Sequence, residues 1–235
     1  MIQTAERTDC LTSRLIANDD PYTESVRAGG GLLRRGHRWD FVAMRWWSRI
    51  YEYRWLTDAV EAFFGPDRRG RTALDAACGG GHPGCFMLAD MGFAHVRAVD
   101  LFDTHPMMGS LKRRNLSYAR ADLTEPIEGR YDLVVSLSLL EHLELDAQRV
   151  VLGNLCDAVG PGGALLMTFV VPGFEHDTDV DAHLACCADH GLRVATEPLD
   201  AGRVMTSRTS PVPYPGWPAL GRDETSVYRL FGVKA

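Results

Sequence analysis

The residues that can support ligand chemistry are concentrated in one stretch, LDAACGGGHPG at residues 74–84. An apolar run ends there in Asp75, and three consecutive glycines follow before a helix-like segment begins. Glycine is needed where the backbone turns sharply and approaches a ligand closely, because it has no Cβ. We therefore expect a nucleoside-bearing cofactor to lie over this turn.

The spacing of the glycines does not by itself identify that cofactor. Gly79, Gly81 and Gly84 also fit the GxGxxG pattern of enzymes that bind dinucleotides. The carboxylate of Asp75 separates the two cases, because a pyrophosphate gains nothing from a nearby negative charge, whereas an amino-acid ammonium group is stabilised by it. The pattern therefore favours S-adenosylmethionine, whose methionine part carries such a group, over NAD.

Acidic and polar residues end three more apolar runs of the chain. Asp100 lies where a carboxylate can accept hydrogen bonds from both ribose hydroxyls. Asp122 lies where a carboxylate can accept one from the adenine amino group. Ser136 and Leu137 end the next run. Because ligands of open α/β sheets bind at the carboxyl ends of the strands, we expect all these positions to converge on one edge.

Short apolar runs alternate with longer helix-like stretches around these residues, which predicts a doubly wound α/β fold with parallel strands joined by helical crossovers. The expected strands are residues 72–77, 96–100, 116–120, 131–136, 164–171, 192–196 and 226–235. The expected crossover helices are residues 85–91, 106–114, 145–159 and 180–190.

The chain of 235 residues is expected to form one domain, at residues 37–235, behind a flexible leader at residues 1–36 that is polar and glycine-rich. Apolar residues at helical spacing predict a helical cap over residues 37–66, as two helices or as one helix broken near Tyr53. Residues 201–225, rich in Gly, Pro, Ser and Thr, are expected to form a long loop before the last strand.

The order of these motifs, over about residues 74–171, resembles that of the class I S-adenosylmethionine-dependent methyltransferases. The glycine turn of that family is typically acidic-x-Gly-x-Gly-x-Gly. Asp75, Ala77, Gly79 and Gly81 occupy these positions here, with Ala77 in place of the first glycine. The resemblance implies a mainly parallel, seven-stranded Rossmann-like sheet whose last strand is antiparallel.

The resemblance also implies roles for single residues beyond the glycine turn. Asp100 is implied to bind the ribose, and Leu101 to pack beside the adenine. Asp122 and Leu123 are implied to hold the base, and residues 136–137 to pass beneath the methionine moiety.

A general base is optional in this chemistry, because the sulfonium methyl is already activated and the protein mainly has to align the nucleophile. A hydroxyl acceptor near neutral pH nevertheless benefits from a base. His142, after the fourth strand, and Glu175 and His176, after the fifth, are the candidates. The alternative for Glu141 and His142 is that the pair only packs and caps a short helix.

Aromatic residues of the expected helical cap and of the expected long loop are candidates for the acceptor pocket. We expect Trp47 and Tyr51, from the helical cap, and Tyr214 and Trp217, from the long loop, to line an apolar pocket or to face the sulfonium cation. The alternative is that the rings of the cap simply pack against the sheet.

A possible metal site lies in the expected helix at residues 180–190, where His183, Cys187 and His190 share one face. Adjacent cysteines such as Cys186 and Cys187 are more typical of small core residues in an apolar helix face. We therefore predict that the protein holds no metal.

The composition limits the partners of the protein. The formal net charge of −6 does not favour nucleic acid, and no apolar run is long enough for a membrane span. The six cysteines lack CxxC pairs and no secretion signal is evident, which predicts a cytoplasmic protein. We expect a methyltransferase that acts on an oxygen or nitrogen of a small molecule. The alternatives are an NAD-dependent oxidoreductase, a non-catalytic cofactor-binding module and, less favoured, an enzyme that methylates RNA or protein.

Overall fold

The computed structural model describes residues 9–16, 20–21, 47–79, 83–102, 113–171, 175–197 and 226–235. The strands are β1 (Arg14–Ile16), β2 (Thr72–Ala76), β3 (His95–Asp100), β4 (Leu116–Arg120), β5 (Tyr131–Leu137), β6 (Val159–Val171), β7 (Leu192–Val194) and β8 (Ser226–Lys234). The helices are α3 (Trp47–Phe64), α4 (Gly84–Asp90), α6 (Leu145–Ala158) and α7 (Val180–Asp189), with a short 3-10 helix, η3 (Leu140–His142).

The strands form one sheet in the order β1-β8-β6-β5-β2-β3-β4, and β7 also pairs with β8. All pairs from β6 through β5, β2 and β3 to β4 are parallel, whereas β8 is antiparallel to β6. The expected mainly parallel sheet with an antiparallel last strand is therefore confirmed. The described residues form eight strands and not the expected seven, because β1 also pairs with β8. The carboxyl ends of β5, β2 and β3 meet at one edge, since these strands are neighbours in the sheet.

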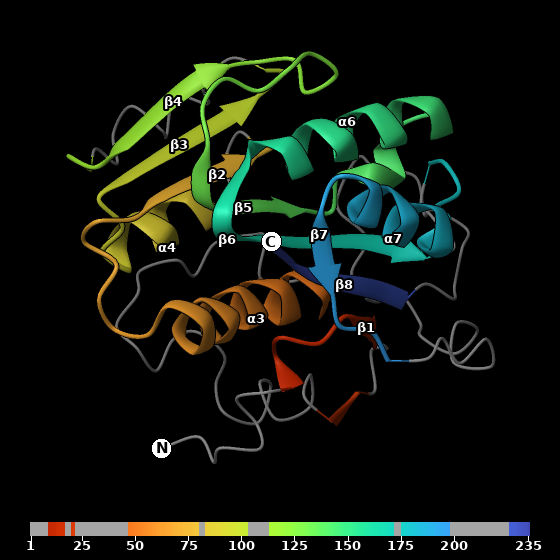
Figure 1. The fold of residues 1–235 in the computed structure, drawn as a ribbon, viewed down its shortest axis with the longest axis horizontal. Coiled ribbons are helices and arrows are strands. Elements are labelled where there is room, and N and C mark those ends of the chain that lie inside the picture. Colours follow the sequence, from red (N-terminus) through yellow and green to blue (C-terminus); the bar gives the residue numbers. More distant parts are fainter. Residues whose placement is uncertain are drawn as a thin grey trace, which may run out of the picture.

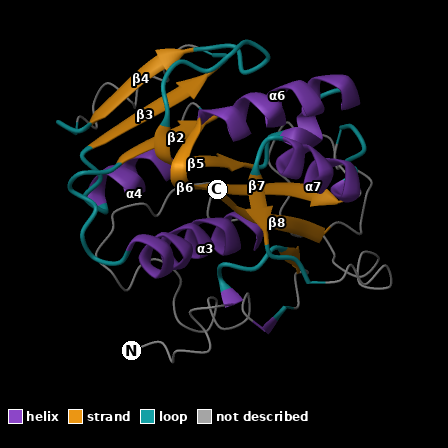
Figure 2. Ribbon diagram, in the orientation of Figure 1, coloured by secondary structure: helices purple, strands orange, loops and turns teal. Residues whose placement is uncertain are grey.

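Helices cover both faces of the sheet, which makes the domain a three-layer sandwich (Figures 1 and 2). Successive residues of a strand point to opposite faces, and β2 shows this: Ala73 belongs to one core and Leu74 to the other. Trp55 of α3 and Phe86 of α4 pack in the first core, whereas Leu152 of α6 packs in the second. The doubly wound arrangement is thus confirmed.

Strand β6 begins at Val159, five residues earlier than the sequence indicates. The added part pairs irregularly, because the register shifts between Tyr131 and Leu133 of β5. A Cβ at Gly163 would lie 2.8 Å from the carbonyl oxygen of Asp132, so the backbones approach more closely there than a side chain permits.

Residues 14–16 lie within the expected flexible leader but form strand β1, which corrects that expectation for this segment. Strand β1 pairs antiparallel with β8 in the register Leu15 to Tyr228. The bond between the backbone N–H of Ser13 and the carbonyl of Ala195 joins the same segment to the chain after β7. The leader is therefore, at this point, an edge of the sheet.

Helix α3 runs without interruption from Trp47 to Phe64, so the expected break near Tyr53 is wrong. Tyr53 and Trp55 are buried, and the indole N–H of Trp55 donates to the carbonyl of Cys10 at 2.8 Å. The helix covers one face of the sheet, and the burial of nearly all of residues 51–60 explains why its polar centre does not break it.

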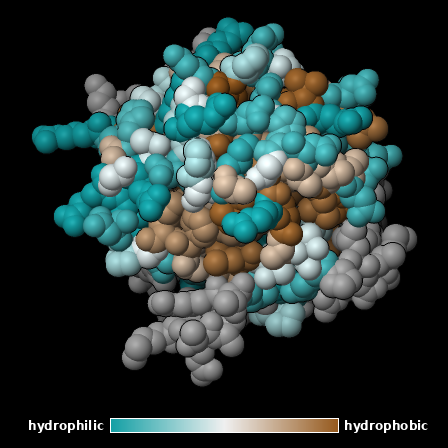
Figure 3. Space-filling view, in the orientation of Figure 1, coloured by the Kyte–Doolittle hydropathy of each residue, from teal (hydrophilic) through white to brown (hydrophobic). Residues whose placement is uncertain are grey.

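The visible face in Figure 3 is mostly hydrophilic, with apolar residues gathered near its middle. Within the described residues, no helix is long and apolar enough to cross a membrane. The expected helix at residues 106–114 lies largely outside the described residues, as do the loop at 201–225 and residues 37–46 of the expected cap.

Candidate active site

The glycine turn after β2 has a left-handed backbone. Ala77 has a φ of 58° and Gly79 a φ of 64°. This conformation is strained for alanine and unstrained for glycine. It therefore agrees with the motif pattern, which has a glycine where this chain has Ala77. The backbone N–H of Gly79 donates to Oδ2 of Asp100 at 2.8 Å, so the turn after β2 is held directly by the carboxylate that ends β3. Gly81 lies outside the described residues.

Asp75, in β2, is buried next to the start of α4. The pKa of Asp75 is raised to about 7, mainly by loss of hydration and also by the nearby carboxylate of Asp100, while the backbone N–H of Cys85 opposes the shift. A Cβ on Gly84 would lie 2.8 Å from Oδ2 of Asp75. The carboxylate therefore packs against the backbone of the first helical turn.

Replacing Gly84 with alanine is expected to destabilise the fold by about 1 to 3 kcal/mol, because the new methyl group overlaps the buried Asp75 carboxylate. Gly70→Ala is the matched control, since a Cβ there meets no atom within 4 Å. Urea denaturation of both variants measures the difference. Equal stability of the two variants would show that the contact has no cost.

Asp100 is buried, and its Oδ1 accepts from the backbone N–H of Phe102 at 3.2 Å. The two residues that follow it expose apolar surface: Leu101 is 50% exposed and Phe102 is 73% exposed. A flat apolar base can cover such side chains. The structure thus joins a carboxylate to an open apolar surface at the end of β3.

Asp122 follows β4 and is exposed, whereas Leu123 is buried. Oδ1 of Asp122 accepts both the backbone N–H and the hydroxyl of Thr124, at 2.9 and 2.7 Å, and these bonds lower the pKa of Asp122. Both bonds use the same oxygen, so this turn fixes the position of the carboxylate. A contact between Asp122 and a base stays a prediction.

Ser136 is fully buried, and its hydroxyl has no hydrogen-bond partner within the described part of the chain. Leu137 packs against the core beneath α3, and its carbonyl accepts from the guanidinium of Arg49 at 3.3 Å. Ser138 then takes a left-handed φ of 53°. The end of β5 is therefore bound to α3.

A buried polar cluster connects the end of β5 to α3, and the sequence patterns did not predict it. The cluster consists of Arg49, Glu52, Ser138, Glu141 and Thr168. The hydroxyls of Ser138 and Thr168 each donate to Oε1 of Glu52 at 2.6 Å. Arg49 donates to Oε2 of Glu52 at 2.9 Å. Glu52, fully buried and bonded on both oxygens, thus fixes a cation at the carboxyl edge of the sheet.

Glu141 of η3 is the second carboxylate of this cluster. It is 1% exposed, and its Oε2 has no hydrogen-bond partner among the described residues. The pKa of Glu141 is raised to about 7, mainly by burial and also by the charge of Glu52, while its own backbone N–H, Arg49 and Ser138 oppose the shift. A carboxyl group with these properties exchanges a proton near neutral pH.

The raised pKa of Glu141 predicts a pH-dependent stability. Because the pKa in the fold exceeds the ordinary value of 4.5, protonation stabilises the folded chain, and the free energy of unfolding falls as the pH rises from 4.5 to about 7. Glu141→Gln removes this decline. Relative to wild type, the variant is expected to gain on the order of 1 to 3 kcal/mol between acid pH and about pH 8. Urea denaturation across this range measures it, and parallel profiles would contradict it.

The two candidate bases, His142 and His176, lie close to this cluster. The backbone N–H groups of Glu175 and His176 both donate to the carbonyl of Glu141, at 3.1 and 3.0 Å, so the segments after β5 and β6 are joined. Nδ1 of His142 lies 3.4 Å from Oε2 of Glu175, and that of His176 lies 3.5 Å from Oε2 of Glu144. Both imidazoles are partly exposed, and a role for either as base stays a prediction.

Tyr51 lies in the core, which corrects its expected place in an acceptor pocket. Its ring projects from α3 into the core and is fully buried, and its hydroxyl accepts from the guanidinium of Arg229 at 3.0 Å. This ring therefore agrees with the alternative interpretation, in which the rings of the cap pack against the sheet. The backbone of Trp47 starts α3, but its side chain lies outside the described residues, as do Tyr214 and Trp217.

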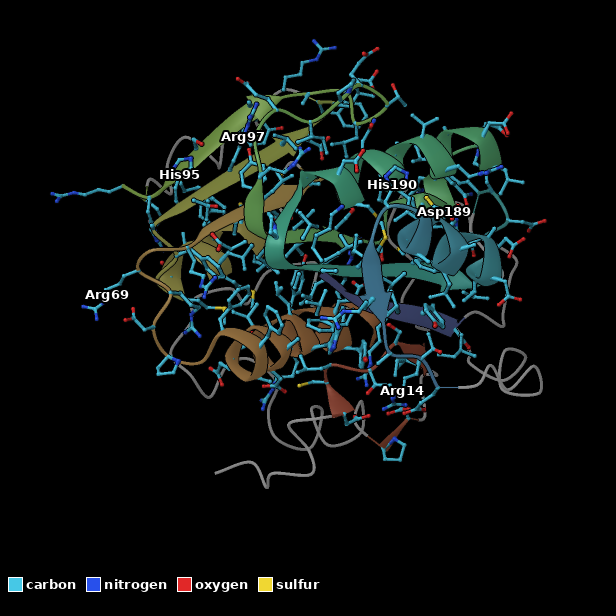
Figure 4. All side chains as sticks on the ribbon, viewed as in Figure 1. Arg14, Arg69, His95, Arg97, Asp189 and His190 are labelled. Atoms are coloured by element: carbon cyan, nitrogen blue, oxygen red, sulfur yellow. The ribbon has the colours of Figure 1, made fainter. Side chains whose placement is uncertain are left out.

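The histidines and cysteines of α7 have separate partners. Nε2 of His183 lies 3.0 Å from Oε1 of Gln148, and the sulfur of Cys187 lies 3.9 Å from that of Cys156. His190, at the end of α7 beside Asp189 (Figure 4), lies 3.0 Å from a carboxylate oxygen of Asp157. The described residues contain no group of three or more side chains placed to hold a metal ion.

The arrangement at the carboxyl edge fits an adenosyl amino acid. Asp75 and Asp100 offer negative charge beside the glycine turn, and Leu101 offers apolar surface. Arg49 is the additional feature, because it offers positive charge that a carboxylate can meet. The order of the strands explains why these groups, distant in the chain, lie together.

Comparison with known proteins agrees with this geometry. A family model described as a methyltransferase domain matches residues 46–194, more than half of the chain. No curated protein matches the chain with statistical significance.

Solved structures with the same fold are distant in sequence. The structure of magnesium protoporphyrin IX methyltransferase from Synechocystis with bound SAM has a TM-score of 0.58 and 18% identity, over 91% of this chain and 97% of that one. An S-adenosylmethionine-dependent methyltransferase from Mesorhizobium loti has a TM-score of 0.53 and 18% identity, over 76% and 100%. Phosphoethanolamine N-methyltransferase 2 from Haemonchus contortus, in complex with S-adenosyl-L-methionine, has a TM-score of 0.54 and 14% identity, over 77% and 52%.

The family match and the shared fold confirm the resemblance stated from the motifs. The chain therefore belongs to the methyltransferase domain family and has the fold of the S-adenosylmethionine-dependent enzymes.

Proposed function

We propose that this methyltransferase binds S-adenosylmethionine at the carboxyl edge of β2, β3 and β5 and transfers its methyl group to an oxygen or nitrogen of a small molecule. The observation that supports this most is the 2.8 Å bond between the glycine turn at Gly79 and the carboxylate of Asp100. It joins the two sequence motifs that a nucleoside needs, one for close backbone approach and one for the ribose hydroxyls.

Each part of the cofactor has a matching group in this proposal. Asp100 accepts the ribose hydroxyls, while Leu101 and Leu123 contact the base and Asp122 accepts its amino group. Asp75 provides negative charge near the ammonium group, and Ala77, Gly79 and Gly81 provide the backbone turn. Residues 136–137 pass beneath the methionine part, whose carboxylate meets Arg49.

Bound S-adenosylmethionine supplies the activated methyl group, so the chain has to position the acceptor and exclude water. His142 and His176 are proposed to approach the acceptor from the segments after β5 and β6, as groups that can take a proton. Trp47, Tyr214 and Trp217 remain proposed contacts of the acceptor.

A small-molecule acceptor is proposed because the chain carries a net charge of −6, which does not favour nucleic acid. The named acceptors of two similar folds, a magnesium porphyrin and phosphoethanolamine, are both small molecules. They differ in chemistry, so the fold does not select between them.

Two measurements test the proposal. Isothermal titration is expected to show binding of S-adenosylhomocysteine and none of NAD. Incubation with S-adenosylmethionine labelled on its methyl group, together with a fractionated cell extract, is expected to label the small-molecule filtrate. Binding of NAD alone would overturn the cofactor, and label found only in the protein or RNA fraction would overturn the acceptor class.

A further inference from the structure

Glu141 is a buried ionisable group at the carboxyl edge of the sheet that the proposed cofactor contacts leave unused. It lies in η3, directly after β5, at the edge where ligands of open α/β sheets bind. Its Oε2 is buried and has no hydrogen-bond partner among the described residues. A buried oxygen of this kind costs free energy unless a ligand satisfies it.

The charges around Glu141 indicate what kind of ligand group meets it. Four buried carboxylates, those of Glu52, Asp75, Asp100 and Glu141, surround the carboxyl ends of β2, β3 and β5 in the described part of the chain. Arg49 is the cation that the same part provides there, and Glu52 already binds it at 2.9 Å. The proposed cofactor adds only one net positive charge, so negative charge remains in excess, and excess buried negative charge attracts a cation.

From this geometry we propose that Oε2 of Glu141 recognises the ammonium group of an amine acceptor and takes its proton. The inference rests on the proposed function and narrows its acceptor to nitrogen. A neutral hydroxyl acceptor would leave the charge of ionised Glu141 uncompensated, whereas an ammonium group pairs with this carboxylate in buried surroundings, where the attraction is stronger than in water.

The reaction balances with the groups named. The ammonium group gives one proton to the Glu141 carboxylate and becomes a neutral amine with a free lone pair. That lone pair forms the nitrogen–carbon bond while the carbon–sulfur bond breaks and its electron pair stays on sulfur. The methylated product carries the positive charge that the sulfonium loses, and Glu141 releases its proton to solvent when the product leaves.

Methylamine is the probe for this proposal, because any site for a primary ammonium group must admit it, and methanol is its neutral counterpart. S-adenosylhomocysteine formation is expected to be at least tenfold faster with methylamine than with methanol. Glu141→Gln is expected to lower the methylamine rate at least tenfold. The control Glu128→Gln, whose side chain is 90% exposed at the other end of β5, is expected to change it less than twofold.

Binding measurements separate this inference from the function on which it rests. The dissociation constant of S-adenosylhomocysteine is expected to change less than twofold in Glu141→Gln. Carboxyl carbon resonances of labelled glutamate supply a readout on the wild-type protein, in which methylammonium chloride, and not equal sodium chloride, is expected to shift the Glu141 signal.

Each outcome decides one of the two claims. Loss of S-adenosylhomocysteine binding by the wild type would overturn the proposed function. Retained binding with equal methylamine and methanol rates, an unaffected Glu141→Gln rate or an unmoved Glu141 signal would overturn the amine proposal alone.

Discussion

Replacing Arg229 with methionine is expected to lower the free energy of unfolding by about 2 to 4 kcal/mol. The guanidinium of Arg229 is fully buried and donates to the carbonyls of Asp9 and Thr12 and to the hydroxyl of Tyr51. It also lies over the ring of Trp55, 6.0 Å from its centre. Methionine keeps much of the volume but leaves these acceptors unpaired, so the residues before β1 lose the contacts with β8 and α3 that this guanidinium makes.

Arg69→Met is the matched control for this variant. Arg69 is 87% exposed and pairs with Asp67 at 3.2 Å, and exposed ion pairs contribute little to stability. Urea denaturation is expected to show no change for Arg69→Met. If Arg229→Met were equally stable, the segment at residues 9–16 would not depend on this guanidinium.

Replacing Asp100 with alanine is expected to weaken binding of S-adenosylhomocysteine at least tenfold, which corresponds to about 1.4 kcal/mol or more. The variant loses the proposed bonds to the ribose hydroxyls. It also loses the acceptor that holds the backbone N–H groups of Gly79 and Phe102, so the glycine turn is no longer fixed before the ligand arrives.

Isothermal titration measures this effect, with Asp189→Ala as the control. Asp189 is an exposed aspartate at the end of α7, away from the glycine turn (Figure 4). The control is expected to bind with wild-type affinity. A folded Asp100→Ala variant with unchanged affinity would remove Asp100 from the cofactor site.

The central sheet could be predicted from the sequence because each strand is a local pattern. Strand β4 has the predicted bounds, and β8 differs by one residue. The contact of Asp100 with Gly79 follows from the same reasoning, since consecutive parallel strands place their carboxyl ends side by side.

The elements that escaped prediction depend on distant parts of the chain. Strand β1 has three residues, and its pairing with β8 joins Leu15 to Tyr228, so no local periodicity marks it. Tyr51 was expected in a pocket because aromatic residues suit both a pocket and a core. Only its bond to Arg229 distinguishes the two environments.

The buried cluster at the end of β5 could not be predicted from the sequence either. Glu52 occurs among charged residues of a helix, a pattern that usually indicates a solvated face. Its partners, Ser138 and Thr168, lie far from it in the chain, so a local pattern does not reveal them. Only the glutamate-histidine pair at residues 141–142 could have indicated this cluster, because the pair comes soon after a predicted strand.

The position of β8 also determines when the sheet can be completed. It lies between β6 on one side and both β1 and β7 on the other. Neither β1 nor β7 therefore has a strand to pair with until β8 has been synthesised. Among the described strands, β1 is synthesised before the others and β8 after them, so β1 cannot pair until β8 has been made. Pairing over so large a sequence separation is slow, so the nascent chain exposes the unprotected side of β6 to other proteins, and chaperones are expected to act at this stage.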